Sequence, residues 1–573
     1  MLGVSDVGQF RLKNHRTTRR AALKAGVLGA GAVAFGVPSA RSDGQLLPAS
    51  PPTTLFVEPL PIAPLAQPVP AFPTLADPSA TNVDGSTAYH RSGPREVASN
   101  TLFYRIEEKQ AFHSFHPQLP PTSIWGYNGI FPGPTFFTTS GVPSLMRFVN
   151  SLPASDPIGI GEPISAIHRH GGFSAPENDG YPLDTFAIGQ SRDYYFENKP
   201  EGGLEQNELS LQWYHDHSID VTAPNVYRGL AGFLISYDRL DSLAGEDDPD
   251  IQAFRLPGKM ALDANGTSYR KYDIPLVFQD KSFDSRGQLV YDNFDHDGFI
   301  GDKFLVNGQI QPYLDVERRK YRFRFLNGSN ARIYEFFLVK DRKAVAFHYV
   351  IGSDVLLFER PVTDVASIRM APAERYDVVI DFSRFPAGSE VILENRMEQS
   401  NGRKPDGLRT PGTPLLKFRV GEATRDPSQV PPNLRVLDPN ERPEKLLTQV
   451  KVERTFKWSR SGGAWVLNDY LFDENRINAK PKRGVPEIWT LKAGGGWSHP
   501  IHIHLSAFHI LSRKGGQPPR LELGRKDTVR IGWEEGDVKL LIKFEKFTGR
   551  YVFHCHNVEH EDMRMMGQFE VRP

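Results

Sequence analysis

The sequence of 573 residues contains a single cysteine, Cys555. One thiol cannot pair within the chain, so an intramolecular disulfide framework is excluded. The sequence has no apolar run long enough to cross a bilayer, and we expect no membrane span in the mature protein. The 68 basic and 68 acidic residues balance, which excludes the positive field expected of a nucleic-acid-binding protein. Long helical periodicities are scarce, whereas the 50 glycines and 46 prolines favour an all-β architecture with many turns.

The N-terminus has the pattern of an export signal. Two adjacent arginines, Arg19 and Arg20, precede a weakly apolar stretch of small residues at positions 25–37. This order is typical of the twin-arginine (Tat) route. We therefore predict a signal peptide over residues 1–42, recognised by the Tat export machinery, and a bacterial periplasmic or extracellular location. A basic tail without a targeting role is the alternative.

The rest of the chain predicts a linker followed by three blocks of strands. Residues 43–95 are rich in proline and poor in charge, which indicates an extended, polyproline-like linker. Strand patterns then recur in residues 96–240, 271–420 and 446–573. Three such blocks agree with the several domains expected for this length, at about 150 residues each.

The last block carries the residues with the clearest chemistry. Cys555 lies between His554 and His556, and His560 and Met565 follow it in the sequence. A thiolate, an imidazole and a distal thioether supply most of the ligands of a blue-copper site, which needs one more histidine. The residues before Cys555 have a strand pattern, and neighbouring side chains on a strand face opposite sides. Cys555 should then face one side and the two flanking histidines the other. A buried structural cysteine among unrelated histidines is the alternative.

Ten of the 17 histidines lie in four clusters, a distribution too uneven for incidental side chains. Two H-x-H pairs lie in the first block, and on a strand each pair points to one face. The last block holds the other two clusters. The clustered residues are His168, His170, His215, His217, His499, His502, His504, His554, His556 and His560. The middle block has only isolated histidines, His296 and His348, so we interpret it as structural.

The order H-x-H, H-x-H, H-P-x-H-x-H and H-C-H-x-x-x-H-x-x-x-x-M resembles that of the multicopper oxidases, in particular their bacterial laccase branch. The resemblance extends from about residue 100 to residue 573. It implies an all-β fold of three cupredoxin-like Greek-key β-sandwich domains. It also implies four copper ions, one of type 1, one of type 2 and two of type 3, with dioxygen as a partner.

The resemblance further assigns roles to individual residues. It implies that the type 1 copper is bound by His499, Cys555 and His560 with Met565 axial, the type 2 copper by His168 and His502, and the type 3 pair by His170, His215, His217, His504, His554 and His556. Asp179 and Glu561 match carboxylates that shuttle protons in related laccases, so we take them as catalytic candidates. A turn aspartate and a solvated glutamate are the alternatives. Asp216, between two implied ligands, is expected to orient a ligand ring.

The implied activity is a laccase-like oxidation. Small aromatic electron donors such as phenols, aminophenols or bilirubin would give up single electrons, and dioxygen would be reduced to water. Two alternatives stay open: a cuprous or metal-ion oxidase in copper resistance, and a non-enzymatic cupredoxin-like envelope protein. The complete histidine clusters argue against the second. The sequence has only eight methionines and no Met-rich run, which argues against the first, because thioethers are the soft ligands that suit Cu(I).

Overall fold

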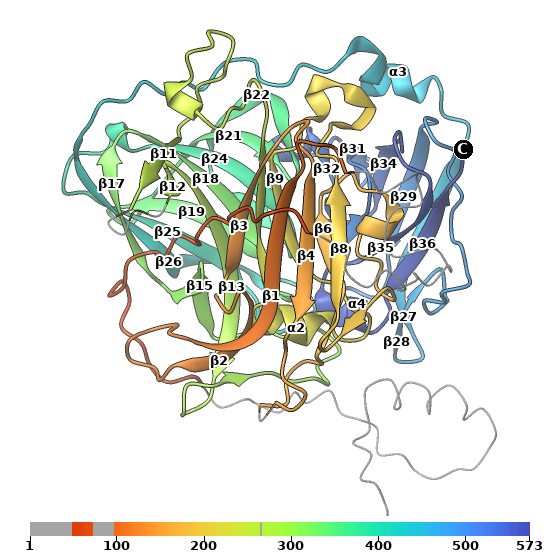
Figure 1. The fold of residues 1–573 in the computed structure, drawn as a ribbon, viewed down its shortest axis with the longest axis horizontal. Coiled ribbons are helices and arrows are strands. Elements are labelled where there is room, and N and C mark those ends of the chain that lie inside the picture. The colour runs from red at the N-terminus through yellow and green to blue at the C-terminus, as the bar shows by residue number, and fades with distance from the viewer. Residues whose placement is uncertain (1–48, 73–96, 157, 264–265, 267) are drawn as a thin grey trace, which may run out of the picture. The chain divides into compact units, whose positions relative to one another are not determined.

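The computed structural model describes residues 49–72 and 97–573, apart from residues 157, 264, 265 and 267. The predicted signal peptide, residues 1–42, lies outside the described residues, and so do positions 73–95 of the predicted linker. Within the described part, no helix is long and apolar enough to cross a membrane. This part is mostly β-strand, and its strands fall into three groups along the chain (Figure 1).

The first group of strands forms two facing sheets. One has the strand order β2-β1-β4-β8 and the other the order β3-β10-β9-β6. Side chains of both sheets meet in one apolar core, where the rings of Tyr104 and Phe136 pack edge to face at 5.1 Å. This is the packing of a β-sandwich. The strands are β1 (Leu102–His113), β2 (Thr122–Tyr127), β3 (Gly133–Thr139), β4 (Ser144–Asn150), β6 (Ile167–His170), β8 (Ser191–Phe196), β9 (Leu211–Asp216) and β10 (Ala231–Tyr237), with the short pair β5 (Ile164–Ser165) and β7 (Phe186–Ala187).

The middle group repeats this design around the largest core. The first sheet runs β16-β15-β13-β18-β24-β21-β22 with β14 on β13, and the second runs β17-β26-β25-β19-β20 with β23 on β19. Phe323, Phe336 and Phe418 join the two sheets in one cluster. The strands are β13 (Asp273–Phe283), β14 (Leu289–Val290), β15 (Lys303–Val306), β16 (Gln309–Ile310), β17 (Tyr313–Arg318), β18 (Lys320–Asn327), β19 (Tyr334–Lys340), β20 (Lys343–Val345), β21 (Phe347–Ser353), β22 (Leu356–Val365), β23 (Ile368–Met370), β24 (Arg375–Asp381), β25 (Glu390–Glu398) and β26 (Gly407–Ala423), preceded by the hairpin β11 (Lys259–Leu262) and β12 (Ser268–Lys271).

The last group again forms two sheets, with strand orders β28-β27-β29-β34-β31-β32 and β33-β30-β35-β36. Trp489 and Phe553 belong to their shared core, which also contains Cys555 and Met565. The strands are β27 (Glu453–Ser461), β28 (Ala464–Leu467), β29 (Glu487–Ala493), β30 (Ser498–Ile503), β31 (Phe508–Arg513), β32 (Arg525–Lys526), β33 (Thr528–Gly532), β34 (Val538–Ile542), β35 (Gly549–Cys555) and β36 (Met566–Val571). A short helix, α3 (Pro443–Leu447), precedes the group.

Strand register brings the clustered histidines side by side. In the first group β6 pairs with β9, which sets His168 opposite His215. In the last group β30 pairs with β35, which sets His502 opposite His554 and Ile501 opposite Cys555. Because alternate residues on a strand share a face, this register holds His168 and His215 on one side of the first sheet and His502 and His554 on one side of the last, whereas Cys555 faces the other side of that sheet.

Two short helices join the first and last groups next to these strands. Helix α2 (Thr222–Arg228) follows β9, and helix α4 (Val558–Asp562) follows β35. The backbone N–H groups of Thr222 and Ala223, at the start of α2, donate to the two carboxylate oxygens of Asp562 at 2.8 and 2.9 Å. Unpaired amides at a helix start favour an acidic partner, so this contact ties one histidine-bearing sheet to the other.

Residues 49–72, within the predicted linker, are extended and paired with both neighbouring groups. Leu60 N–H donates to the carbonyl of Tyr313 at 2.7 Å, and Ala66 N–H donates to that of Thr135 at 2.8 Å. The Leu60 side chain is 6 % exposed and belongs to the middle core. The proline-rich composition accounts for the extended conformation, whereas the contacts depend on the few apolar residues between the prolines.

Candidate metal centre

One group of metal-ligating side chains lies wholly in the last group of strands. It consists of His499 from β30, Cys555 from the end of β35 and His560 from α4, all buried. The Cys555 Sγ atom lies 3.5 Å from Nδ1 of both histidines, and the two Nδ1 atoms are 3.2 Å apart. Met565 is fully buried in the same core. Two imidazoles and one thiolate in a triangle, with a thioether nearby, form the ligand set of a blue-copper site.

The ring of His560 is held by a segment of the middle group. Its Nε2–H donates to the carbonyl of Asp297 at 3.1 Å, which leaves Nδ1 to face Cys555. Asn557 caps α4 by accepting from the His560 N–H at 3.3 Å, and it donates to the same Asp297 carbonyl at 3.0 Å. Burial raises the pKa of the Cys555 thiol, so a bound cation is what would keep this group as a thiolate.

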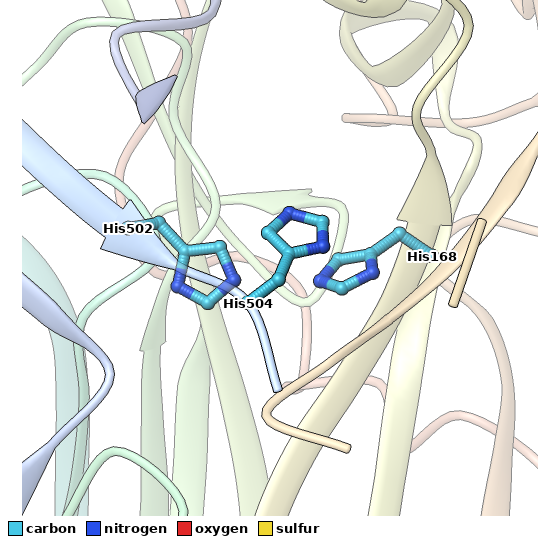
Figure 2. Close-up of side chains that lie close together, drawn as sticks. All are labelled: His168, His502 and His504. Carbon is cyan, nitrogen blue, oxygen red and sulfur yellow. The ribbon is translucent and has the colours of Figure 1, made fainter. Parts of the chain in front are cut away.

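The second centre gathers eight histidines from the first and last groups. Three sets of ligand atoms lie close together: His168, His502 and His504; His170, His215 and His556; and His217, His504 and His554. Figure 2 shows the rings of the first set, with His168 facing the two side chains of the last group. All eight rings are buried. The structure thus brings together every histidine of the four sequence clusters in two centres.

Protein contacts determine which nitrogen of each ring faces inward. The Nδ1–H groups of His168, His215 and His502 donate to the backbone carbonyls of Asp179, Asp216 and Asp527, at 2.6, 2.7 and 2.9 Å. Their Nε2 atoms have no partner in the described part of the chain. Such hydrogen bonds fix the tautomer and the orientation of metal-ligating histidines.

The facing nitrogens of three rings at the second centre fit a metal. Three Nε2 atoms converge on one another, with His554 Nε2 lying 3.2 Å from that of His217 and 3.3 Å from that of His504. Buried polar atoms are normally paired, and a cation between the rings would satisfy all three. Burial, together with the charge that neighbouring rings would carry, lowers the pKa of His215 to about 3 and that of His217 to about 4. A lowered pKa favours the neutral imidazole, the form that binds metal.

Comparison with known proteins agrees with this donor set. Residues 110–241 and 438–573 match two family models, each described as multicopper oxidase. The bilirubin oxidase of Albifimbria verrucaria is 35% identical over 532 residues, which cover 91% of this chain and 82% of that protein. The laccase of Bacillus subtilis is 30% identical over 533 residues, which cover 83% of this chain and 96% of that protein. The chain belongs to the multicopper oxidase family.

Solved structures extend the similarity to the fold of this multicopper oxidase. A crystal structure of laccase from Pediococcus acidilactici superposes with a TM-score of 0.70 at 26% identity, covering 92% of this chain and 95% of that one. The predicted all-β fold of cupredoxin-like β-sandwich domains is confirmed. The predicted laccase-like function is confirmed as well: the protein is a copper-dependent oxidoreductase that uses oxygen as the acceptor.

The two acidic candidates of the multicopper oxidase both lie at the second centre. Asp179 follows the short helix η1 (Pro176–Asn178), and its Oδ2 accepts from His504 Nδ1 at 2.7 Å. Glu561 Oε2 lies 3.0 Å from His554 Nδ1, and its Oε1 lies 3.5 Å from His217 Nδ1. Both side chains are about 2 % exposed, so neither is a solvated surface charge.

The environments of these carboxylates differ. Burial raises the pKa of Asp179. Burial would also raise the pKa of Glu561, but the positive charge that His554 and His217 can carry holds that pKa well below its usual value. Asp216 acts through its backbone carbonyl on His215, while its side chain turns away and accepts from Ser218 Oγ at 2.8 Å.

Three residues at the multicopper oxidase centres were not found from the sequence. Asp297 belongs to the middle block, which was interpreted as structural, yet its carbonyl binds the ring of His560. Asp527 and Thr528 contact His170 at 3.3 Å each. For Asp527 and Thr528 the one sequence signal was the two adjacent charged residues, Lys526 and Asp527, before an apolar strand, because charged residues that become buried need partners.

Proposed function

We propose that this laccase-like oxidase takes electrons from small aromatic donors, such as phenols, aminophenols or bilirubin, at His499, Cys555 and His560, and reduces dioxygen between the eight clustered histidines. The observation that carries the proposal is the tripeptide 554–556. Cys555 belongs to the centre formed with His499 and His560, and its two neighbours belong to the second centre. The names of the relatives, a bilirubin oxidase and laccases, support an aromatic donor.

The ligand roles follow the sequence resemblance, and we propose four copper ions per chain, the stoichiometry characteristic of the family. A type 1 copper would be held by His499, Cys555, His560 and Met565, a type 2 copper by His168 and His502, and a type 3 pair by His170, His215, His217, His504, His554 and His556. The close grouping of these side chains supports the assignment. Bound copper supplies one-electron redox chemistry and the reduction of dioxygen to water.

The protein residues supply the path, the orientation and the protons. The backbone of residues 554–556 joins the two centres covalently and gives electrons a short through-bond route. The Nδ1 contacts of His168, His215 and His502 hold their rings rigidly, which limits rearrangement during turnover. Reduction of dioxygen to two waters consumes four protons. Asp179 and Glu561 are the carboxylates placed at this centre to relay them, and each touches a ring nitrogen of an implied ligand.

Copper loading and oxygen uptake test the proposed function. The purified chain supplied with copper should turn blue, bind four coppers and consume oxygen with a phenol. Cys555→Ser should lose both the blue band and donor oxidation, because a hydroxyl cannot replace the thiolate in a blue-copper site. Retention of both properties in Cys555→Ser would refute the assignment. Faster oxygen uptake with Cu(I) than with any aromatic donor would instead favour the metal-ion oxidase.

We also propose the domain layout and the route of export. The separate sheets of the three strand groups support domains at residues 96–240, 271–420 and 446–573. The twin arginines support export through the Tat machinery to the bacterial periplasm or beyond. Replacing Arg19 and Arg20 by lysine should retain the protein in the cytoplasm of a Tat-competent host, as measured by cell fractionation. Unchanged export of that variant would contradict the proposed Tat route.

A further inference from the structure

His170 is oriented differently from the other rings at the second centre. Its Nε2, not its Nδ1, faces protein oxygens, at 3.3 Å from Asp527 Oδ1 and 3.3 Å from Thr528 Oγ1. Its Nδ1 has no partner among the described residues and is the atom left for a metal. A carboxylate that accepts from the outer nitrogen of a ligand histidine fixes which nitrogen faces inward.

Asp527 contacts a second histidine through its backbone. Its carbonyl accepts from His502 Nδ1 at 2.9 Å, which leaves His502 Nε2 facing the centre. His170 comes from β6 of the first strand group and His502 from β30 of the last. One residue therefore sets the orientation of two rings that come from opposite sides of the centre.

Asp527 is in turn held by the middle group of strands. Arg375, the first residue of β24, donates from Nη1 and Nη2 to the two carboxylate oxygens of Asp527 at 2.7 and 2.6 Å. Asp354, between β21 and β22, accepts from the backbone N–H groups of Asp527 and Thr528 at 3.0 and 3.1 Å. A bidentate arginine–carboxylate pair adds geometric specificity to its strength.

Gly171, the residue after His170, leaves space for the pair of Arg375 and Asp527. Gly171 has a φ of +83°, and a Cβ atom there would lie 2.7 Å from Arg375 Nη2 and 3.0 Å from Asp527 Oδ2. A larger residue would displace the arginine. The side chains of Arg375 and Asp527 are 0 and 3 % exposed, so the pair is shielded from water and its geometry is fixed by the surrounding structure.

We propose that Asp527 is a positioning residue for the copper cluster, and that Arg375 of the middle strand group holds Asp527 in place. This rests on the proposed function. The middle group, which has no histidine at the second centre, then sets the inward nitrogen of His170 and the angle of His502. The packing of the middle group is thereby coupled to the geometry of the bound metal.

The test removes the charge of Asp527 in one variant and the bidentate fork of Arg375 in the other. Asp527→Asn and Arg375→Lys are loaded with copper and compared with the wild type by copper content, by the electron paramagnetic resonance signal of the type 2 copper and by oxygen uptake. We expect an altered type 2 signal or a lost copper in both variants, and turnover about 10- to 100-fold lower. The blue band should be unchanged, because Cys555 is untouched. Thr528→Val, which removes one hydroxyl, should shift the same signal to a smaller extent.

A matched control separates positioning from general loss of stability. Asp241 forms a similar buried pair with Arg322 of the middle group, at 2.7 and 2.8 Å, and its carboxylate accepts from that arginine and not from a histidine. Asp241→Asn should lower the unfolding temperature but leave the type 2 signal and the turnover of folded protein unchanged. An unaltered signal and turnover in both Asp527→Asn and Thr528→Val would overturn the inference. A wild-type protein without copper or oxidase activity would overturn the proposed function instead.

Discussion

Asp179 and Glu561 each contact a histidine of the second centre, so their charge can be removed without removing an implied ligand. The backbone carbonyl of Asp179 also accepts from His168, and this contact survives Asp179→Asn. We expect Asp179→Asn and Glu561→Gln to retain copper while oxygen reduction slows by about 10²-fold, the usual contribution of a proton-transfer group. Copper analysis with oxygen-uptake kinetics measures both quantities. Asp193→Asn, a buried carboxylate paired with Arg147, serves as the control. Unchanged turnover returns either residue to a purely structural role.

Glu201 is a buried carboxylate whose titration should be visible in the stability of the protein. Burial raises its pKa to about 8 from an ordinary value of 4.5. The folded state therefore binds this proton more tightly than the unfolded state. The resulting stability is complete below about pH 4.5 and is lost as the pH rises to about 8.

Glu201→Gln should remove this pH dependence. Its amide oxygen can still accept from the Glu545 N–H, which Glu201 binds at 2.9 Å. As the pH rises from 5 to 9, we expect the unfolding free energy of the variant to increase by about 2–4 kcal/mol relative to that of the wild type. The size follows because each tenfold difference in proton affinity between the folded and unfolded states corresponds to about 1.4 kcal/mol. Urea unfolding at several pH values measures this difference in unfolding free energy. Glu205→Gln, a substitution of an exposed neighbour, is the control. Parallel curves for wild type and Glu201→Gln would contradict the expectation.

Residue types and spacing predicted the histidine clusters, because period-two strands and short motifs are local properties, and the family resemblance implied that the clusters meet. They could not predict the outer contacts. Asp527 lies far in sequence from its partners Arg375 and His170, and only the packing of three strand groups brings them together. For the same reason no role for Asp297 could be predicted, because its carbonyl reaches His560 from another group.

At the scale of elements, the strand groups were predictable as blocks, but the segment 49–72 was not predictable as part of a core. Its prolines indicated an extended chain, and extended chains are often free linkers. The bridges that it forms with Tyr313, Thr135 and Phe103 depend on the free edges of β17 and β3 and on the first part of β1, which precedes the pairing of β1 with β2. Edge positions are decided by tertiary topology and cannot be read from one segment.

Leu60 should anchor this segment to the middle group. Its side chain is 6 % exposed within the apolar core, and truncating a buried leucine costs about 2–5 kcal/mol. We expect Leu60→Ala to lie near the lower end, about 2 kcal/mol, because the segment is at the edge of the core. Thermal and urea unfolding measure the loss. Leu55→Ala, at a side chain 39 % exposed, should change stability by less than about 0.5 kcal/mol. Equal effects of the two substitutions would mean that the segment does not contribute to the core.

At the scale of the whole molecule, the second centre joins the first and last strand groups. Its histidines come from β6 and β9 of the first strand group and from β30 and β35 of the last, and Asp562 of α4 binds the start of α2 beside them. Without metal, the buried Nε2 atoms of His168, His215 and His502 have no partner in the described part of the chain, and buried unpaired nitrogens destabilise the folded state. The association of the first and last groups should therefore depend on metal.

Removing copper should lower the stability of the whole described fold, not of one strand group alone. A ligand that binds only the folded state stabilises it by about 4 kcal/mol at a thousandfold excess over its dissociation constant. We expect chelated protein to unfold at a lower temperature than the copper-loaded form in calorimetry. We also expect hydrogen exchange to rise in β6, β9, β30 and β35 before it rises in the middle sheets, because the metal crosslinks those four strands. Re-addition of copper should restore both properties, whereas zinc, which also binds histidine but carries no redox chemistry, should restore stability without oxygen uptake. An apo protein with the same unfolding temperature and exchange pattern would show that the packing of the three groups alone assembles the centre.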